Sequence, residues 1–340
     1  MRFSVLDRAA VAVGEEEGHT LRAVAQHAEH VEDLGFARFL VAEHHAVPGI
    51  PGSQPAILAS YVASQTARIQ VGTAGIMVPN HPPLIIAEQA AMLESLYPGR
   101  IIIGLGSSVG FTKPVREALR QTVEAKQRFD SDLAQVRNFL LGDAPITLRP
   151  HAGPPLFVLA GFRSALSAAK LGLGVILGGP VETQVEAARV YRENFQGTSP
   201  VVISSLNIAV AEDEAYARRL LLPEAYAQVL SRSTGVFGAL DPDPDLKGLT
   251  GQQRERLEQT LANTVYGTPA AVEAKLADIA EKLGVEEFLV TGDMPDREGR
   301  AHSEELLAGL DLFTRMHAPP KKRPNEDARA AQPWCRRVFA

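Results

Sequence analysis

Short apolar runs alternate with longer segments in which apolar residues recur every three or four positions. The short runs are nearly continuous in Val, Ile, Leu and Ala, which is typical of parallel strands that are buried on both faces. This pattern predicts strands at residues 3–7, 38–42, 70–78, 101–105, 156–160, 174–178, 201–210 and 286–291.

The longer segments predict amphipathic helices. Between residues 21 and 34, apolar side chains recur at spacings of three and four, and Gly35 follows where a C-terminal cap belongs. Thr268 and Pro269 predict the N-cap and first turn of a second helix, whose apolar stripe ends at Gly284. Parallel strands need such crossover helices, which then cover the sheet.

The pattern predicts eight strands with helices between them, which is the count found in an α/β protein of the (β/α)8 TIM-barrel type. A doubly wound open sheet would show the same alternation. The long connections at 107–155 and 211–285 predict insertions after strands 4 and 7, and the Pro-, Gly- and Asp-rich segment 235–251 predicts a mobile loop. We expect one domain over residues 1–318, followed by a flexible basic tail at 319–340.

The composition narrows the choice of partners and compartment. Of the 340 residues, 45% are hydrophobic and 22% charged, which suffices for a large core. A net charge of −6 does not favour a nucleic acid or an anionic membrane as partner, and no apolar run is long enough to predict a membrane span. Cys335 is the single cysteine, and Asp7 and Arg8 interrupt the N-terminus where a signal peptide would be apolar, so we expect a cytoplasmic protein.

Glu43, His44 and His45 directly follow the second predicted strand. The carboxyl ends of barrel strands carry active sites, and an imidazole suits acid–base chemistry near neutral pH. Adjacent side chains of an extended chain point in opposite directions, so His44 and His45 are not expected to chelate one ion, and no metal-ligand spacing supports His81 as a further ligand. We predict no metal site; polar residues that merely end a strand are the alternative.

Small residues occupy the third strand at 72–75, with the sequence Gly-Thr-Ala-Gly. Glycines weaken a strand and often mark a place where a ligand or another backbone comes close. A flat aromatic ring against this strand would explain them, and so would close packing inside a barrel.

Two further glycine-containing segments follow predicted strands. Residues 104–110 resemble a dinucleotide fingerprint, but the third glycine is one position late, which favours a polar loop. Residues 161–164 place a glycine, a guanidinium and a hydroxyl at a helix start, which predicts a phosphate cradle. An ordinary helix start with a surface arginine is the alternative.

The motif VAEHH at 41–45 and the block VGTAGIMVPNHPPLIIAEQAAMLESLYPGRIIIGLG at 71–106 resemble the bacterial luciferase-like flavin monooxygenases. Residues 157–172 and 267–292 add weaker support. The similarity is greatest to the small group that includes polyketide-tailoring oxygenases.

The resemblance implies a TIM-barrel homodimer that uses FMN. A separate flavin reductase would deliver the FMN reduced, and its C4a-hydroperoxide with O₂ would oxygenate a small organic substrate. A polyketide substrate, and hence a role in secondary metabolite biosynthesis, is one expectation from the resemblance.

The resemblance also assigns roles to residues of this chain. His44 matches the family's general acid/base, and Glu43 is the acidic neighbour that would orient it or balance its charge. Ala74-Gly75 matches a non-prolyl cis peptide beside the flavin ring. The cofactor-binding residues implied for the phosphate side are Ser107, Ser108, Gly161, Phe162, Arg163 and Ser164.

One departure leaves the cofactor open. Flavin-using members of the family often have an arginine where this chain has Ser107. Its absence is common in the branch that uses the deazaflavin F420, so an F420-dependent oxidoreductase that transfers hydride is the first alternative. A non-catalytic flavin-binding protein is the second.

Overall fold

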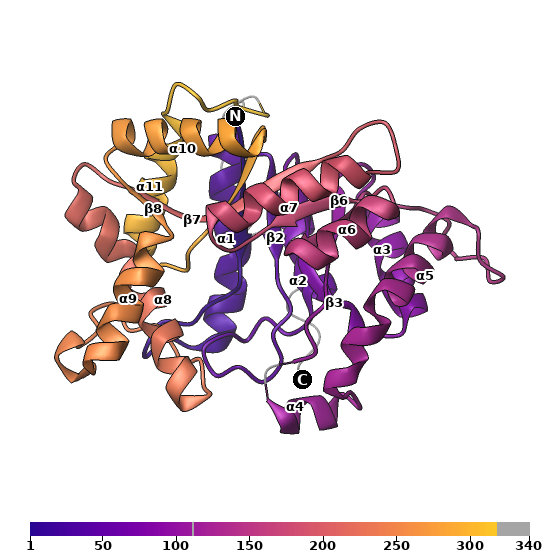
Figure 1. Cartoon of the computed structure of the whole chain (residues 1–340), viewed down its shortest axis with the longest axis horizontal. Coiled ribbons are helices and arrows are strands. Elements are labelled where there is room, and N and C mark those ends of the chain that lie inside the picture. The colour runs from indigo at the N-terminus through magenta and orange to yellow at the C-terminus, as the bar shows by residue number, and fades with distance from the viewer. Residues whose placement is uncertain (111, 318–340) are drawn as a thin grey trace, which may run out of the picture.

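The protein is a closed barrel of parallel strands with helices on its outside (Figure 1). We describe it from a computed structural model, for residues 1–110 and 112–317. Each barrel strand pairs in parallel with the next, and β6 pairs with β7 to complete the ring. The barrel strands are β1 (Arg2–Asp7), β2 (Arg38–Val41), β3 (Gln70–Met77), β4 (Ile101–Gly106), β5 (Leu156–Ala160), β6 (Gly174–Leu177), β7 (Val202–Val210) and β9 (Glu287–Thr291).

This arrangement confirms the TIM barrel and all eight predicted strands. One further strand, β8 (Val265–Gly267), pairs with the end of β7 outside the ring. The sequence did not predict it, because three residues are too few to show a periodicity. The predicted tail at 319–340 lies outside the described residues.

Helices connect the strands and cover the barrel. The insertion after β4 contains α4, η2 and α5, and that after β7 contains α8, η3, α9, β8 and α10, as the long connections predicted. Among the described helices, none combines the length and apolar character that crossing a membrane requires. The helices are α1 (Glu17–Leu34), α2 (Pro55–Gln65), η1 (Val78–Asn80), α3 (Pro83–Leu96), α4 (Lys113–Ala118), η2 (Val123–Arg128), α5 (Phe129–Leu141), α6 (Phe162–Lys170), α7 (Val181–Asn194), α8 (Glu214–Thr234), η3 (Leu246–Gly248), α9 (Gly251–Ala262), α10 (Pro269–Leu283) and α11 (Arg297–Ala308).

The structure confirms where the sequence predicts α1 to end and α10 to begin and end. Gly35 and Gly284 end α1 and α10 in the left-handed conformation, with φ of 93° and 60°. Thr268 is the N-cap of α10 with Pro269 after it, but the Thr268 side chain makes no capping hydrogen bond.

An apolar layer fills the barrel interior, and every barrel strand contributes to it. It separates the two ends of the barrel and forms a solid floor below the end where the strands finish. The residues are Leu6, Leu40, Ala74, Ile102, Phe157, Leu159, Ile176, Ile203 and Leu289.

The backbones of β3 and β4 come unusually close together. A Cβ on Gly72 would lie 1.8 Å from the carbonyl oxygen of Ile102, and one on Gly75 would lie 2.7 Å from that of Gly104. Barrel packing therefore accounts for Gly72. Gly75 is the extra residue where the register between the two strands shifts.

The segment 235–251, which the sequence predicts to be a mobile loop, is held by hydrogen bonds. The Leu240 N–H donates to the carbonyl of Val11 at 2.7 Å, and the Gly49 N–H donates to that of Phe237 at 3.0 Å. Leu240 is fully buried. The insertion after β7 is therefore attached to the loops that follow β1 and β2.

A buried histidine joins β1, α1 and α11. His27 Nδ1 lies 2.6 Å from Asp7 Oδ2, and its Nε2 lies 2.6 Å from Glu304 Oε1. Burial opposes a charge on His27, and so does Arg300, but the two carboxylates outweigh them and raise its pKa. The imidazolium thus balances two buried carboxylates.

Replacing His27 by Gln should lower the free energy of unfolding by about 3–5 kcal/mol, because two buried carboxylates lose their cation. The raised folded pKa fixes the sign of the pH dependence. The stabilisation from His27 is fully present below its unfolded pKa of about 6.5 and is lost as the pH rises through the folded value. Urea unfolding of both proteins between pH 6 and 9 should therefore show a difference that shrinks toward high pH. His302→Gln, at an exposed histidine beside Glu212, should cost much less. A His27 effect that grew with pH would contradict this assignment.

Candidate active site at the barrel mouth

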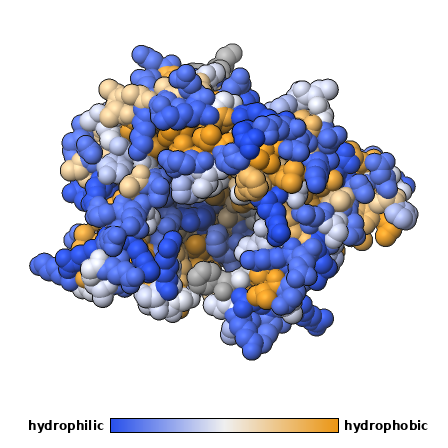
Figure 2. Space-filling view, in the orientation of Figure 1, coloured by the Kyte–Doolittle hydropathy of each residue, from blue (hydrophilic) through white to orange (hydrophobic). Residues whose placement is uncertain are grey.

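A cavity of about 530 Å³ opens where the first strands of the barrel end. A second cavity of about 280 Å³ adjoins it, since both are lined by Leu6, Ala74 and Leu159 of the apolar floor. The space-filling view shows this face hollowed between the α8–α9 pair and α4 (Figure 2). We call the two cavities together the barrel mouth. The carboxyl ends of the strands are where TIM-barrel enzymes place their active sites.

The barrel mouth collects most of the residues predicted from the sequence. The larger cavity is lined by Glu43, His44, Ala74, Gly75, Ser107 and Ser108, and the smaller one by Gly161. Phe162, Arg163 and Ser164 begin α6 beside Gly161 but line neither cavity, and Phe162 and Arg163 are exposed.

His44 reaches the larger cavity from the end of β2. Its backbone N–H donates to the carbonyl of Gly52 at 3.0 Å, whereas its buried Nδ1 has no hydrogen-bond partner among the described residues. Burial and the positive charge of Arg8 lower the pKa of His44 to about 4, against the opposing effect of Glu43. At neutral pH the imidazole that lines the cavity is therefore uncharged.

Glu43 is fully buried, and its hydrogen bonds hold the segment that follows β3. It accepts hydrogen bonds from His45 and His81 at 2.6 and 2.9 Å and from the backbone N–H of Met77 at 2.9 Å. Burial alone would raise its pKa, but these bonds and the His81 charge lower it to about 2. The expectation that Glu43 orients His44 is corrected in one respect. These contacts orient His45 and His81, and the effect of Glu43 on His44 is electrostatic.

Arg8 lines the same cavity and was missed by the sequence analysis as a site residue. Its Nη2 lies 2.5 Å from Glu224 of α8 and 2.7 Å from Asp293, which follows β9. Burial raises the pKa of Asp293 to about 6, although Arg8 opposes the shift. Its position directly after β1 was the available signal, since the same rule selected Glu43 and His44 after β2.

Gly75 of β3, Gly106 of β4 and Gly161 after β5 line the mouth with backbone that carries no side chain; we call the part formed by Ala74 and Gly75 the thin edge of β3. The peptide bond between Ala74 and Gly75 is cis, as the resemblance implies. A Cβ on Gly161 would meet no heavy atom within 4 Å, and one on Gly106 would come no closer than 3.8 Å to another atom. Backbone free of side chains lets a flat ligand approach closely.

The sequence matches the family described as luciferase-like monooxygenase over residues 1–287. The chain belongs to the luciferase-like monooxygenase family. An N-acetyl-S-alkylcysteine monooxygenase of Bacillus subtilis (strain 168) is 33% identical, over 92% of this chain and 98% of that protein. The protein in the crystal structure of apo-MsnO8 has 30% sequence identity to this chain. The two structures superpose with a TM-score of 0.79, over 92% of this chain and 99% of that one.

More distant structures share the family's fold. The oxygenating constituent of 3,6-diketocamphane monooxygenase from Pseudomonas putida, in complex with FMN, has a TM-score of 0.72 at 16% identity and covers 94% of this chain and 99% of its own. An F420-dependent secondary alcohol dehydrogenase with an F420-acetone adduct has a TM-score of 0.69 at 14% identity, over 93% and 99% of the two chains. The fold of this family member is therefore found with either cofactor.

The low pKa of His44 can be measured directly. We expect its ring Cε1–H signal to stay at the neutral position from pH 8 to pH 5 and to titrate near pH 4, because Arg8 and burial disfavour the imidazolium. The measurement is a ¹H–¹³C NMR titration with labelled histidine, in which His44→Gln assigns the signal. A midpoint at or above the ordinary value of about 6.5 would contradict the electrostatic description.

Proposed function

We propose that this family member is a two-component, FMN-dependent monooxygenase that oxygenates a small organic substrate. The observation that carries the proposal is the uncharged, half-buried imidazole of His44, which lines the barrel mouth next to the thin edge of β3. A separate reductase would reduce the FMN, and the bound, reduced FMN would be the group that reacts with O₂. The protein binds, orients and shields the reactants.

The shape and chemistry of the barrel mouth fit a flavin. The isoalloxazine would lie against Ala74 and Gly75, above the apolar floor. For the phosphate we propose the hydroxyls of Ser107 and Ser108 together with the start of α6, residues 161–164. The first amides of α6 have no side-chain cap, and helix N-termini favour anions.

We propose that His44 acts as the general acid/base: it would accept a proton from the bound flavin or substrate and give it back during the reaction. A neutral imidazole can donate one hydrogen bond and accept another. An anionic reduced ring beside it would raise its pKa from about 4 toward neutrality, as the Glu43 charge already does in part. The apolar side chains of Leu6, Leu159 and Leu289 would keep water from the reacting atoms.

F420-dependent hydride transfer is the second candidate, and Ser107 is the observation that favours it. A hydroxyl replaces the cation that flavin-using relatives often place there. We favour FMN because the relative at 33% identity is named as a monooxygenase, whereas the F420-binding neighbour is 14% identical.

The function is tested by oxygen incorporation. The full chain, NADH, FMN and a flavin reductase are incubated under ¹⁸O₂ with a substrate panel that includes an N-acetyl-S-alkylcysteine, a cyclic ketone and an aromatic polyketide. We expect one ¹⁸O in a product that forms only when the reductase is present. His44→Ala should lower its turnover by about 10²–10⁴ while reduced FMN still binds. Anaerobic substrate reduction or oxidation with F420, and no ¹⁸O, would favour the second candidate.

The phosphate assignment predicts a difference between two flavins. Ser107→Ala and Arg163→Ala should each weaken the binding of reduced FMN by about tenfold or more, because a charge-assisted hydrogen bond is lost. Binding of reduced riboflavin, which has no phosphate, should change little. Fluorescence titration under anaerobic conditions measures the affinities for reduced FMN and for reduced riboflavin. Arg137→Ala on α5 is the control and should change neither affinity. Equal losses for the two flavins would remove these residues from the phosphate site.

We further propose that the protein is a homodimer joined through α2 and α3. Large apolar side chains are exposed on both helices: Ile57 (70%) and Tyr61 on α2, and Ile85, Met92 (55%) and Leu96 on α3. On each helix their spacings place them on one face. Contiguous exposed apolar patches mark interaction surfaces.

A charge on this face should separate the subunits. We expect Ile57→Glu combined with Met92→Glu to give monomers, since two charges per subunit would be buried unpaired. Light scattering coupled to size exclusion measures the mass, and Ile146→Glu is the control at an exposed apolar residue in the segment between α5 and β5. A dimer that survives the double substitution would place the interface elsewhere.

A further inference from the structure

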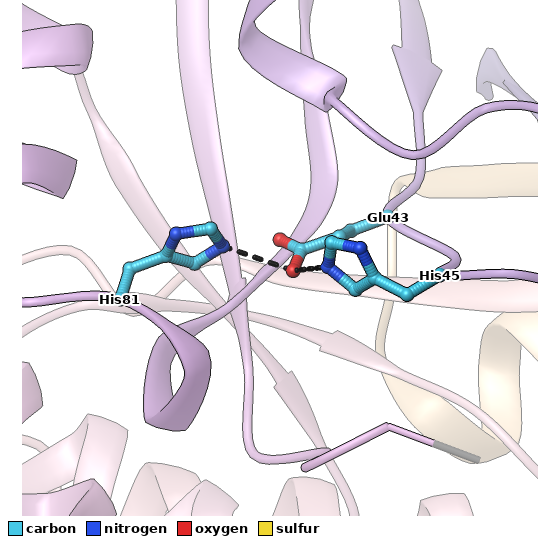
Figure 3. Close-up of side chains that lie close together, drawn as sticks. All are labelled: Glu43, His45 and His81. Carbon is cyan, nitrogen blue, oxygen red and sulfur yellow. Dashed lines mark hydrogen bonds and ion pairs between the residues drawn. The ribbon is translucent and has the colours of Figure 1, made fainter. Parts of the chain in front are cut away.

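Three nitrogen donors converge on one oxygen at the edge of the barrel mouth. His45 Nε2 and His81 Nε2 lie 2.6 and 2.9 Å from Oε1 of Glu43, and the Asn80 amide nitrogen lies 3.4 Å from it. Figure 3 shows the two rings on opposite sides of the carboxylate. His45 follows β2, whereas Asn80 and His81 follow β3, so the cluster joins two loops.

The three candidate ligand atoms lie close enough together that small movements of the side chains would let one divalent ion bind them. One carboxylate oxygen of Glu43, one ring nitrogen of His45 and one ring nitrogen of His81 lie within 4.8 Å of one another. Two imidazoles and a carboxylate are a ligand set of catalytic zinc sites, which leave the fourth position open. The objection that neighbouring histidines diverge applies to His44 and His45, not to this set, because His81 comes from another strand end.

The surroundings of the cluster point to a ligand as well. The side chain of Asn80 is more than nine-tenths buried, with 8% exposed, yet its Oδ1 has no hydrogen-bond partner among the described residues. A water on a bound ion could donate to it. The Met77 N–H holds the second oxygen of Glu43 at 2.9 Å, as outer hydrogen bonds hold metal-ligating carboxylates.

We propose that Glu43, His45 and His81 form a site for one divalent transition-metal ion of the zinc type, with its open position toward the barrel mouth. The ion takes the place of the two imidazole protons at Glu43. Each coordinating ring then carries a single proton, on Nδ1, and a ring that carried two protons before binding releases one to the solvent. The ion would tie the loops after β2 and β3 together, and the site does not depend on the proposed flavin chemistry.

The test is a titration of the full, untagged chain with Co²⁺ and Zn²⁺. It uses a Cys335→Ser background, which removes the one thiol. We expect one ion per chain, Co²⁺ absorption bands of low coordination number, and a higher melting temperature with Zn²⁺. His45→Gln and His81→Gln should each weaken binding by at least about a hundredfold. Glutamine still donates to Glu43, so the metal-free variants should melt close to the parent.

His302→Gln is the matched control, because His302 is an exposed histidine beside Glu212 and Glu305. It should leave the affinity unchanged. Independently of the variants, Co²⁺ should first shift the NMR signals of the His45 and His81 rings. Absence of saturable binding would overturn the proposal. So would binding that survives His45→Gln and His81→Gln, or that shifts other histidines first.

Discussion

The close approach of β3 to β4 is the constraint on which the barrel mouth depends. No side chain fits at Gly72, where the carbonyl of Ile102 occupies the space that a Cβ would need. The register between the two strands shifts at Gly75, and the backbone there lines the cavity without a side chain. Together with the apolar floor, this thin edge leaves a flat space next to the end of β2. Bulky side chains along β3 would fill it.

Arg8, Glu43 and His45 around this space are paired with other charged or ionisable side chains, and His44 differs from them. Arg8 is held by Glu224 and Asp293, while His45 and His81 are held by Glu43. These pairs fix the loops after β1, β2 and β3 in place. The Nδ1 of His44 has no partner among the described residues, and its environment keeps it uncharged. A buried polar atom without a partner calls for an explanation, and a bound ligand that turned the ring would give this nitrogen a partner.

The sequence was most informative where a single segment determines its own structure. Continuous apolar runs identified the eight barrel strands, and glycines marked the ends of α1 and α10. The rule that active sites follow strands selected Glu43 and His44, and the resemblance added Ser107 and the cis peptide at Ala74. What the sequence did not show depends on contacts between distant segments. The hydrogen bonds of Leu240, the three-residue strand β8 and the partners of Glu43 are of this kind. Arg8 could have been found, because it directly follows β1, just as Glu43 follows β2.

The most direct test of the proposed function is an anaerobic titration with reduced FMN, followed by a pulse of oxygen. We predict saturable binding of one flavin per chain and, after the pulse, an absorbing species that decays much more slowly than free reduced FMN oxidises in buffer. Failure to bind reduced FMN, or oxidation as fast as in buffer, would contradict the assignment of the barrel mouth as a flavin site that excludes water.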